Sequence, residues 1–566
     1  MTFDRLKTRL ALHAPTLLVG ACCVVLDGLI IGSCLQVRTS APIVSPWDLL
    51  PNWIFGVFAF ATALLALGTR FVPRHVQTIL FILHAVAAWG VAAIIYRLGF
   101  GFDPFIHQAA EQHLVTYGSI SLQTPLYIGQ YALVWILQKI SYLSVIQIDH
   151  WLVPILSLGL IPLLQRTHRL LPLALFLLPV SAFSFTIPFH LALLLFVCAI
   201  CLSQSPSRPR AFFFLGACAV GSILIHPLIG IPCLVFVLGV FLSETRWRTF
   251  APFIPALGIP LGLLGAMATY AALQDASLRL PTLGSIQASL TALFGTPYHL
   301  STAVIGLSFV YSFLSFWPLI FGLLGLQQNL REQTPWKKYR LATALGLFGA
   351  AIILACLIRL PDIIAHEQFE FPLRLLHVAP LLLLPDVALF LDRFLAGQTK
   401  RKYLIAIGSA LAVGVIATSQ WFASYPQQNK ISPRYAPSVS EHEYAALAWI
   451  EEQRAGKPFV VLSHQMLAAA ALQQNGFDQT ITTCHGTHLS YAIPTGGALY
   501  QDFLAVTRST KLEEALQRVK TCYGDASLFI VLPRYWDQQG VRDAALLPLS
   551  HSVASFGTEL RGYQIK

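Results

Sequence analysis

The side chains best suited to proton transfer gather in one short stretch of the chain, residues 99–113. It carries Asp103, His107, Glu111 and His113, in a chain where charge is otherwise scarce. The first three are four residues apart, so a helix would place them along one face. A carboxylate there can accept a proton from an attacking hydroxyl. His107 can bind a phosphate or hold a divalent metal beside Asp103.

The same residues also have ordinary structural explanations. Asp103 precedes Pro104, and this pair often starts a helix because Asp caps the first turn and Pro fits within it. His107 and His113 are also typical of a helix surface at a membrane interface. Spacing alone therefore leaves catalysis and helix capping both open for Asp103.

Composition indicates a polytopic α-helical membrane protein. Of 566 residues, 56% are hydrophobic and 11% are charged, whereas soluble proteins have about 25% charged residues. Apolar runs of about 20 residues suffice to cross a bilayer as a helix. We predict about thirteen spans, at residues 13–35, 51–69, 77–97, 148–165, 170–183, 188–203, 211–226, 228–243, 250–272, 299–325, 341–360, 373–395 and 402–422.

The Lys and Arg residues beside the predicted spans indicate orientation, because cytoplasmic loops carry an excess of them. With a cytoplasmic N-terminus, eighteen lie inside: Arg5, Lys7, Arg9, Arg70, Arg74, Arg166, Arg169, Arg208, Arg210, Arg246, Arg248, Arg331, Lys337, Lys338, Arg340, Lys400, Arg401 and Lys402. Six lie outside: Arg38, Arg97, Lys139, Arg279, Arg359 and Arg374. The topology signal accounts for most of the net charge of +11, so we infer no nucleic-acid partner.

The chain is predicted to have two domains. Residues 1–423 form the transmembrane domain, with an outer loop at 98–147 that contains interfacial helices. Tyr127, Tyr131 and Trp135 share one face of the second loop helix, as is typical of the membrane interface.

Residues 424–566 form the second predicted domain, which is small, soluble and extracytoplasmic. Ser440 and Glu443 match the capping box that starts a helix. Helical and strand-like segments alternate from there on, which favours an α/β fold. These segments are 441–453, 458–462, 464–474, 479–483, 510–520, 527–532 and 562–565. Cys484 and Cys522 are either disulfide-bonded or two free thiols.

The segment Asp103-Pro104-Phe105-Ile106-His107, with Gly118 closing the following helix, resembles the first outer-loop motif of oligosaccharyltransferase catalytic subunits. The wider plan resembles the GT-C superfamily of polyprenyl-phosphate-dependent membrane glycosyltransferases. In this chain and in the superfamily, an acid lies in the first large outer loop, beside interfacial helices. Many spans and an extracytoplasmic C-terminal domain follow. The turn 183–188 lacks a second acid, and the tail lacks a Trp-Trp-Asp-Tyr-Gly signature. The chain therefore looks more like the enzymes that move a single sugar.

The resemblance implies a glycosyltransferase, inverting in its chemistry, that moves a sugar from a polyprenyl-phosphate-linked donor to a glycan, lipid or protein acceptor. It would act on the outer face of the membrane, which is the plasma or inner membrane if the chain is bacterial. Asp103 would be the base. The leaving phosphate calls for a fixed cation, and the guanidinium of Arg374 fits that role.

Other residues are further candidates for the same site. For the donor phosphate they are His107, Arg279 and Arg359, and as secondary acids Glu111, Glu367 and Glu370. No cofactor is required by the sequence, but a divalent metal, Mg²⁺ or Mn²⁺, held by Asp103 and His107 stays open.

A non-enzymatic membrane protein is the alternative, either a transporter or flippase-like protein or an assembly component. Transporters are often built from repeated halves with paired interrupted spans, and the sequence shows neither. Asp27 and Asp386 are among the acids that lie within the predicted spans. Asp27, at mid-span, is expected to bond a neighbouring helix, because a charge at that depth costs about 2.5–3.5 kcal/mol. Asp386 is expected to pair locally.

Overall fold

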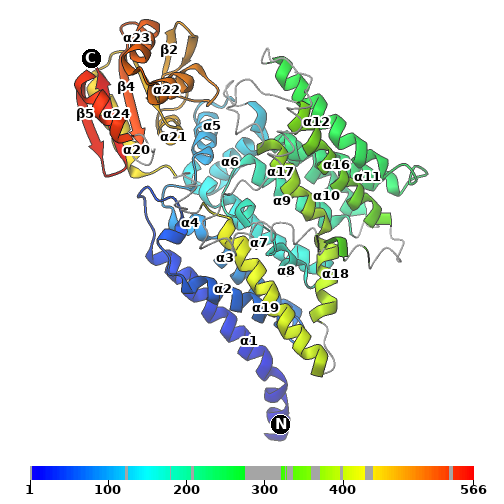
Figure 1. The fold of residues 1–566 in the computed structure, drawn as a ribbon. Coiled ribbons are helices and arrows are strands. Elements are labelled where there is room, and N and C mark those ends of the chain that lie inside the picture. The colour runs from blue at the N-terminus through cyan, green and yellow to red at the C-terminus, as the bar shows by residue number, and fades with distance from the viewer. Residues whose placement is uncertain are drawn as a thin grey trace.

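The region predicted to form the transmembrane domain is a bundle of helices. The computed structural model describes residues 3–120, 125–178, 180–204, 209–273, 335–357, 370–395, 400–426, 438–533 and 539–566, with a few isolated positions from 320 to 327. The helices of this domain are α1 (Phe3–Gln36), α2 (Trp53–Gly68), α3 (Arg74–Trp89), α4 (Val91–Ile95), α5 (Asp103–Tyr117), α6 (Ile128–Ser141), α7 (Val145–Thr167), α8 (Leu171–Leu175), α9 (Pro188–Leu202), α10 (Pro209–Ile225), α11 (Pro227–Ser243), α12 (Phe253–Leu273), α16 (Pro335–Leu357), α17 (Glu370–Val378), α18 (Leu384–Leu395) and α19 (Lys400–Ala423). Figure 1 shows α1, α2 and α19 side by side at one edge of the bundle.

Six helical segments in the described residues are long and apolar enough to cross a membrane. They are Thr16–Gln36, Val145–Thr167, Phe253–Tyr270, Lys338–Leu357, Glu370–Leu395 and Tyr403–Ala423. Four apolar helices are shorter: α2, α9, most of α10, and α11. The structure therefore confirms a mostly helical protein with several candidate membrane spans. The count of thirteen stays a prediction, and the predicted span 299–325 lies almost wholly outside the described residues.

The predicted span 170–183 is not one continuous helix. It contains the five-residue α8 and a four-residue 3-10 helix, Val180–Phe183. The segment contacts α3 near both ends of that helix, because Arg169, just before the segment, donates to Gln77 at 2.8 Å and Phe183 packs against Trp89 at 5.1 Å between ring centroids. Residues 170–178 are buried. Irregular backbone is tolerated at membrane depth where protein surrounds it, so a hydropathy pattern does not distinguish this segment from a regular span.

Two buried ion pairs join helices within the bundle. Asp27 on α1 contacts His84 on α3 at 2.8 Å, and the other ring nitrogen of His84 lies 2.9 Å from Thr62 on α2. This confirms that Asp27 bonds a neighbouring helix. Asp386 on α18 pairs with Arg340 on α16 at 3.1 Å. The expected local pairing of Asp386 is therefore wrong, because helix packing brings a distant guanidinium closer.

The C-terminal region folds around a small mixed sheet. Its helices are α20 (Glu441–Arg454), α21 (Gln465–Asn475), α22 (Ala498–Arg508), α23 (Leu512–Tyr523) and α24 (Gln539–Leu546). Its strands are β1 (Phe459–Ser463), β2 (Thr480–Thr483), β3 (Gly486–Leu489), β4 (Ser527–Pro533), β5 (Ser550–Phe556) and β6 (Leu560–Ile565). The four-stranded sheet has the order β1-β4-β6-β5, with β1 and β4 parallel and the other pairs antiparallel. The hairpin β2-β3 stands apart.

Both faces of this sheet are covered, because alternate residues of a strand point to opposite sides. Val461 and Phe529 belong to the core formed with α20 and α21, whereas Val460 and Ile530 belong to the core formed with α22 and α23. The capping box between Ser440 and Glu443 is present at the start of α20.

Helix α5 joins the two regions of the molecule. Figure 1 shows it between the C-terminal region and the bundle. Phe105 is fully buried in the core that α20, α21 and the sheet form, and Ala109 packs against Leu472 and Phe477. The Gly101 N–H donates to Ser438 Oγ at 2.8 Å, and Gly101 has φ +78°, which glycine adopts readily. The helix that begins with Asp103 is thus fixed from both sides.

Candidate active site

Asp103 and Arg374, which are far apart in the sequence, line one cavity. Its volume is about 270 Å³. Its other lining residues are Leu178, Ser181, Ala182, Phe183, Phe185, Ile187, Phe189, His190, Leu193, His377, Val378 and Leu381. An acid and a guanidinium therefore face a space that is otherwise mostly apolar.

The start of α5 fixes the position of Asp103. Phe102 is the N-cap residue and Asp103 the first helical residue, with Pro104 in the first turn. No side-chain hydrogen bond caps the helix, so Asp103 does not fill the N-cap role that its position before Pro104 favoured. Its carboxylate still gains from the positive end of the helix dipole, which stabilises a negative charge there.

Arg374 lies in the first helix of an interrupted segment. It donates from Nη2 to Glu370 Oε2 at 3.1 Å, and its guanidinium lies 5.4 Å from the ring centroid of Phe189. Glu370, a predicted secondary acid, is thus the ion-pair partner of Arg374. Such exposed pairs four residues apart contribute only about 0.3–0.5 kcal/mol. A phosphate group in the cavity can therefore compete with Glu370 for Arg374.

His107 is not one of the residues that line the cavity, and it lies among aromatic residues. Its Nδ1 is 3.0 Å from the hydroxyl of Tyr131, and its ring is in edge-on contact with Tyr127 at 5.2 Å. Burial, with the charge of Arg374, lowers the pKa of His107 to about 3. His107 is therefore neutral near pH 7 and offers a phosphate no positive charge. Tyr131 is buried in this contact rather than lying on an interfacial face with Trp135.

Glu111 does not reach the cavity but belongs to a buried acidic pair. Its Oε1 accepts from Gln130 at 2.9 Å, and the same amide nitrogen of Gln130 lies 3.4 Å from Asp149. Gln108 donates to Asp149 at 2.9 Å. Burial, and then the charge of Asp149, raise the pKa of Glu111 well above its usual value. Ionisation of Asp149 therefore disfavours ionisation of Glu111 beside it.

This acidic pair is connected to the C-terminal region. Gln473 on α21 donates to Gln108, and Tyr444 on α20 donates to Gln473. A chain of polar contacts thus runs from the C-terminal region through α5 to Asp149 on α7. No sequence pattern indicates this chain of contacts, because the amides of Gln108, Gln130 and Gln473 have no characteristic spacing.

Three predicted site residues, Arg279, Arg359 and Glu367, lie outside the described residues. Two cavity residues, His190 and His377, were not predicted as site residues. His190 Nδ1 donates to the carbonyl of Phe185 at 2.9 Å, which leaves its Nε2 as an acceptor. The only sequence signal for His190 was its place near the outer end of a predicted span.

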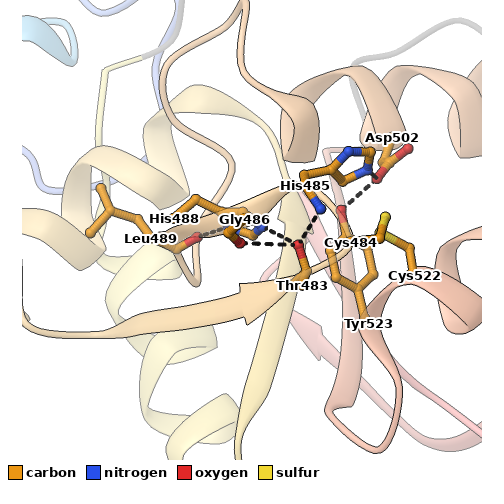
Figure 2. A network of polar contacts seen from close by, with 9 residues as sticks. All are labelled: Thr483, Cys484, His485, Gly486, His488, Leu489, Asp502, Cys522 and Tyr523. Carbon is orange, nitrogen blue, oxygen red and sulfur yellow. Dashed lines mark hydrogen bonds and ion pairs between the residues drawn. A yellow bond between two sulfur atoms is a disulfide. The ribbon is translucent and has the colours of Figure 1, made fainter.

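A second cluster lies in the C-terminal region around the Cys484–Cys522 disulfide (Figure 2). The bond joins the β2-β3 hairpin to α23 across a separation of 38 residues. His485 Nε2 lies 3.5 Å from Asp502, which also accepts from the Tyr523 hydroxyl at 2.5 Å. Closing a loop of this length stabilises a fold by about 4 kcal/mol in the chain-entropy treatment. The disulfide resolves the choice that the sequence left open.

Metal-ligand geometry favours neither cluster as a metal centre. Within the described ranges, the one group of three or more ligand atoms that converge is Cys484, His485 and Cys522. Its two sulfur atoms are bonded to each other, so neither is a thiolate that could bind a metal. Asp103 and His107 are not joined by a third described ligand. Whether Asp103 and His107 bind Mg²⁺ or Mn²⁺ stays untested.

Comparison with known proteins does not assign this chain to a family. No protein-family description matches the sequence, and no curated protein is significantly similar to it. The function is therefore inferred from the residues and their geometry.

Proposed function

We propose that this protein is a membrane glycosyltransferase of GT-C type that transfers a sugar from a polyprenyl-phosphate-linked donor to an acceptor at the outer face of the membrane. The observation that carries the proposal is the shared cavity of Asp103 and Arg374. The two residues were chosen from the sequence for complementary roles, and the fold brings them to one space.

The reaction needs one base and one cation. Asp103 accepts the proton of the acceptor hydroxyl as its oxygen attacks the anomeric carbon. The bond from that carbon to the phosphate oxygen breaks with inversion, and its electron pair stays on the phosphate. Arg374 binds the phosphate and stabilises the charge that develops on it.

The surroundings of the pair suit a lipid-linked substrate. Phe183, Phe189 and Leu381 line the cavity, so an isoprenoid chain can leave the phosphate along apolar side chains. The disulfide of the C-terminal region is of the kind found in oxidising compartments. It supports an extracytoplasmic location for that region, which agrees with the orientation predicted from the Lys and Arg residues.

The test is sugar transfer by the purified full-length protein, supplied with polyprenyl-phosphate sugars and candidate acceptors. Asp103→Asn is compared with Asp478→Asn, because Asp478 is exposed and lies outside the cavity. We expect transfer by the wild type and by Asp478→Asn, and its loss in folded Asp103→Asn. Transfer that persists in Asp103→Asn would show that another group is the base. A chelator arm decides separately whether a metal is used.

One observation favours the alternative of a transporter or flippase-like protein. Two interrupted segments line the cavity, one around α8 and the other formed by α17, a 3-10 helix at Ala379–Leu383 and α18. Interrupted helices often surround transporter sites. Vesicles that contain the protein would then move a polyprenyl-phosphate sugar across the bilayer without transferring the sugar, and that result would replace the enzyme proposal.

A further inference from the structure

Four arginines gather at the opposite end of the bundle from Asp103. The turn between α2 and α3 contributes Arg70 and Arg74, and the end of α7 with the residues after it contributes Arg166 and Arg169. All four line one open cavity of about 650 Å³, together with Phe71, Val72, Pro73, Thr167 and His168. The two turns are more than ninety residues apart in the sequence, so only the fold brings them together.

The position of this arginine cavity follows from α7. Asp149, near the start of α7, is bonded to Gln108 of the α5 helix. Arg166, near the end of α7, lines the arginine cavity. Helix α7 has 23 residues and is a candidate membrane span, which corresponds to a length of about 34 Å. The cavity therefore lies about one bilayer thickness from Asp103, on the side predicted to face the cytoplasm.

Among the described residues, no acid forms an ion pair with the arginines of this cluster. In the described part of the chain, the guanidinium groups of Arg70, Arg74 and Arg166 make no hydrogen bond or ion pair. Arg169 is held by Gln77 and the carbonyl of Val72. Burial and then the charge of Arg74 lower the pKa of Arg169, and the charge of Asp392 opposes them. Like charges are thus held together without a counter-ion from these residues.

The four arginines need not lie around one cavity in order to orient the protein in the membrane. Cytoplasmic arginines orient a membrane protein wherever they lie in their loops, whereas gathering them around one cavity adds repulsion that a bound anion would remove. Guanidinium groups match the geometry of phosphate oxygens. Basic pockets between helices on the cytoplasmic side bind anionic lipid headgroups in other membrane proteins.

Apolar surface adjoins the cavity. Phe71, in its lining, is 43% exposed, and Leu17 and Leu18 of α1 are 63% and 67% exposed. Thr16 donates to the carbonyl of Phe71 at 3.3 Å, so this face of α1 lies beside the cavity. A phosphate bound by the arginines could therefore carry acyl chains that lie against α1.

We propose that the cavity of Arg70, Arg74, Arg166 and Arg169 is a binding site for a phosphate group, either that of an anionic phospholipid or that of a soluble phosphate. This inference goes beyond the proposed glycosyltransferase activity and does not depend on it.

The test is a titration of the full-length protein in neutral detergent, followed by native mass spectrometry. The probes are short-chain phosphatidylglycerol, short-chain phosphatidylcholine, glycerol 3-phosphate and inorganic phosphate. We expect the wild type to bind phosphatidylglycerol in preference to phosphatidylcholine. Equal binding of glycerol 3-phosphate would identify the soluble phosphate as sufficient, whereas a requirement for acyl chains would identify the lipid.

The decisive variant is Arg74→Gln/Arg166→Gln, because both side chains are exposed and their loss breaks no bond between described residues. A basic residue at an anionic surface contributes about fivefold in affinity, so two contribute about thirtyfold. The matched control is Arg246→Gln/Arg248→Gln, which removes two exposed arginines from another predicted cytoplasmic turn. It should bind like the wild type.

Thermal unfolding in neutral detergent checks that each variant is folded. If the double variant is unfolded, Arg166→Gln alone should weaken binding about fivefold. Unchanged affinity in the folded variants would overturn the proposal. So would an equal loss in the Arg246→Gln/Arg248→Gln control, or an absence of preference for any phosphate probe.

Discussion

Two carboxyl groups on the same helix, those of Asp103 and Glu111, have opposite environments. Asp103 faces a cavity that it shares with Arg374. Glu111 is fully buried beside Asp149, and no arginine or lysine contacts it in the described structure. An acid beside a space and a cation can exchange a proton with a substrate. An acid buried beside another acid instead keeps a proton and holds its neighbours in place.

The largest expected effect is on the rate of sugar transfer, and it distinguishes the role of Asp103 from that of Glu111. Asp103→Asn should lower the rate of sugar transfer by about 10²–10⁴-fold, the usual contribution of a general base. Glu111→Gln should stay within a few-fold of the wild type, because an amide can occupy the place of a protonated carboxyl group. The two rates are compared under saturating donor. Equal losses would mean that both acids take part in the reaction.

Arg374 should account for the next largest effect. Arg374→Gln is expected to lower transfer by about 10²–10³-fold, as does the loss of one strong donor to a developing anion. The matched control, Arg246→Gln, should leave transfer unchanged. Thermal stability should barely change, because the pair with Glu370 is partly exposed to solvent and such pairs contribute little. A large loss of stability with normal transfer would make Arg374 a structural residue.

The buried pair predicts a pH dependence of stability. The pKa of Glu111 is raised on folding, so its contribution is fully present below its usual pKa and is lost as pH rises through the folded pKa. Between the usual pKa and the folded-state pKa, the free energy of unfolding falls by about 1.4 kcal/mol per pH unit. Unfolding midpoints measured at increasing pH should fall for the wild type and fall less for Glu111→Gln. Parallel curves would show that Glu111 is not protonated in the folded protein.

The smallest effect concerns the connection to the C-terminal region. Gln473→Ala removes the donor to Gln108 and should cost about 1–3 kcal/mol of stability, because a buried acceptor is left unpaired. Transfer should fall less than in Arg374→Gln, since Asp103 keeps its other supports. Urea unfolding monitored by proteolysis of the C-terminal region measures the change. Gln474→Ala, at an exposed neighbouring position, is the control.

Local patterns predicted local structure well. The capping box of Ser440 and Glu443 starts α20, and the strand-like segments 458–462 and 527–532 correspond to β1 and β4. These features depend on neighbours in the sequence. Helix α22 was not predicted, because its helical signal is weak without the sheet that it covers.

The sequence by itself determined that this is a mostly helical protein with apolar segments long enough to cross a membrane, because composition and hydrophobic runs are properties of the chain alone. Only the tertiary structure decided that Asp103 meets Arg374, that Glu111 is buried beside Asp149, and that four arginines surround one cavity. It also showed that residues 170–183 do not form one continuous helix. Each of these depends on contacts between segments distant in the chain, for which no residue spacing gives a signal.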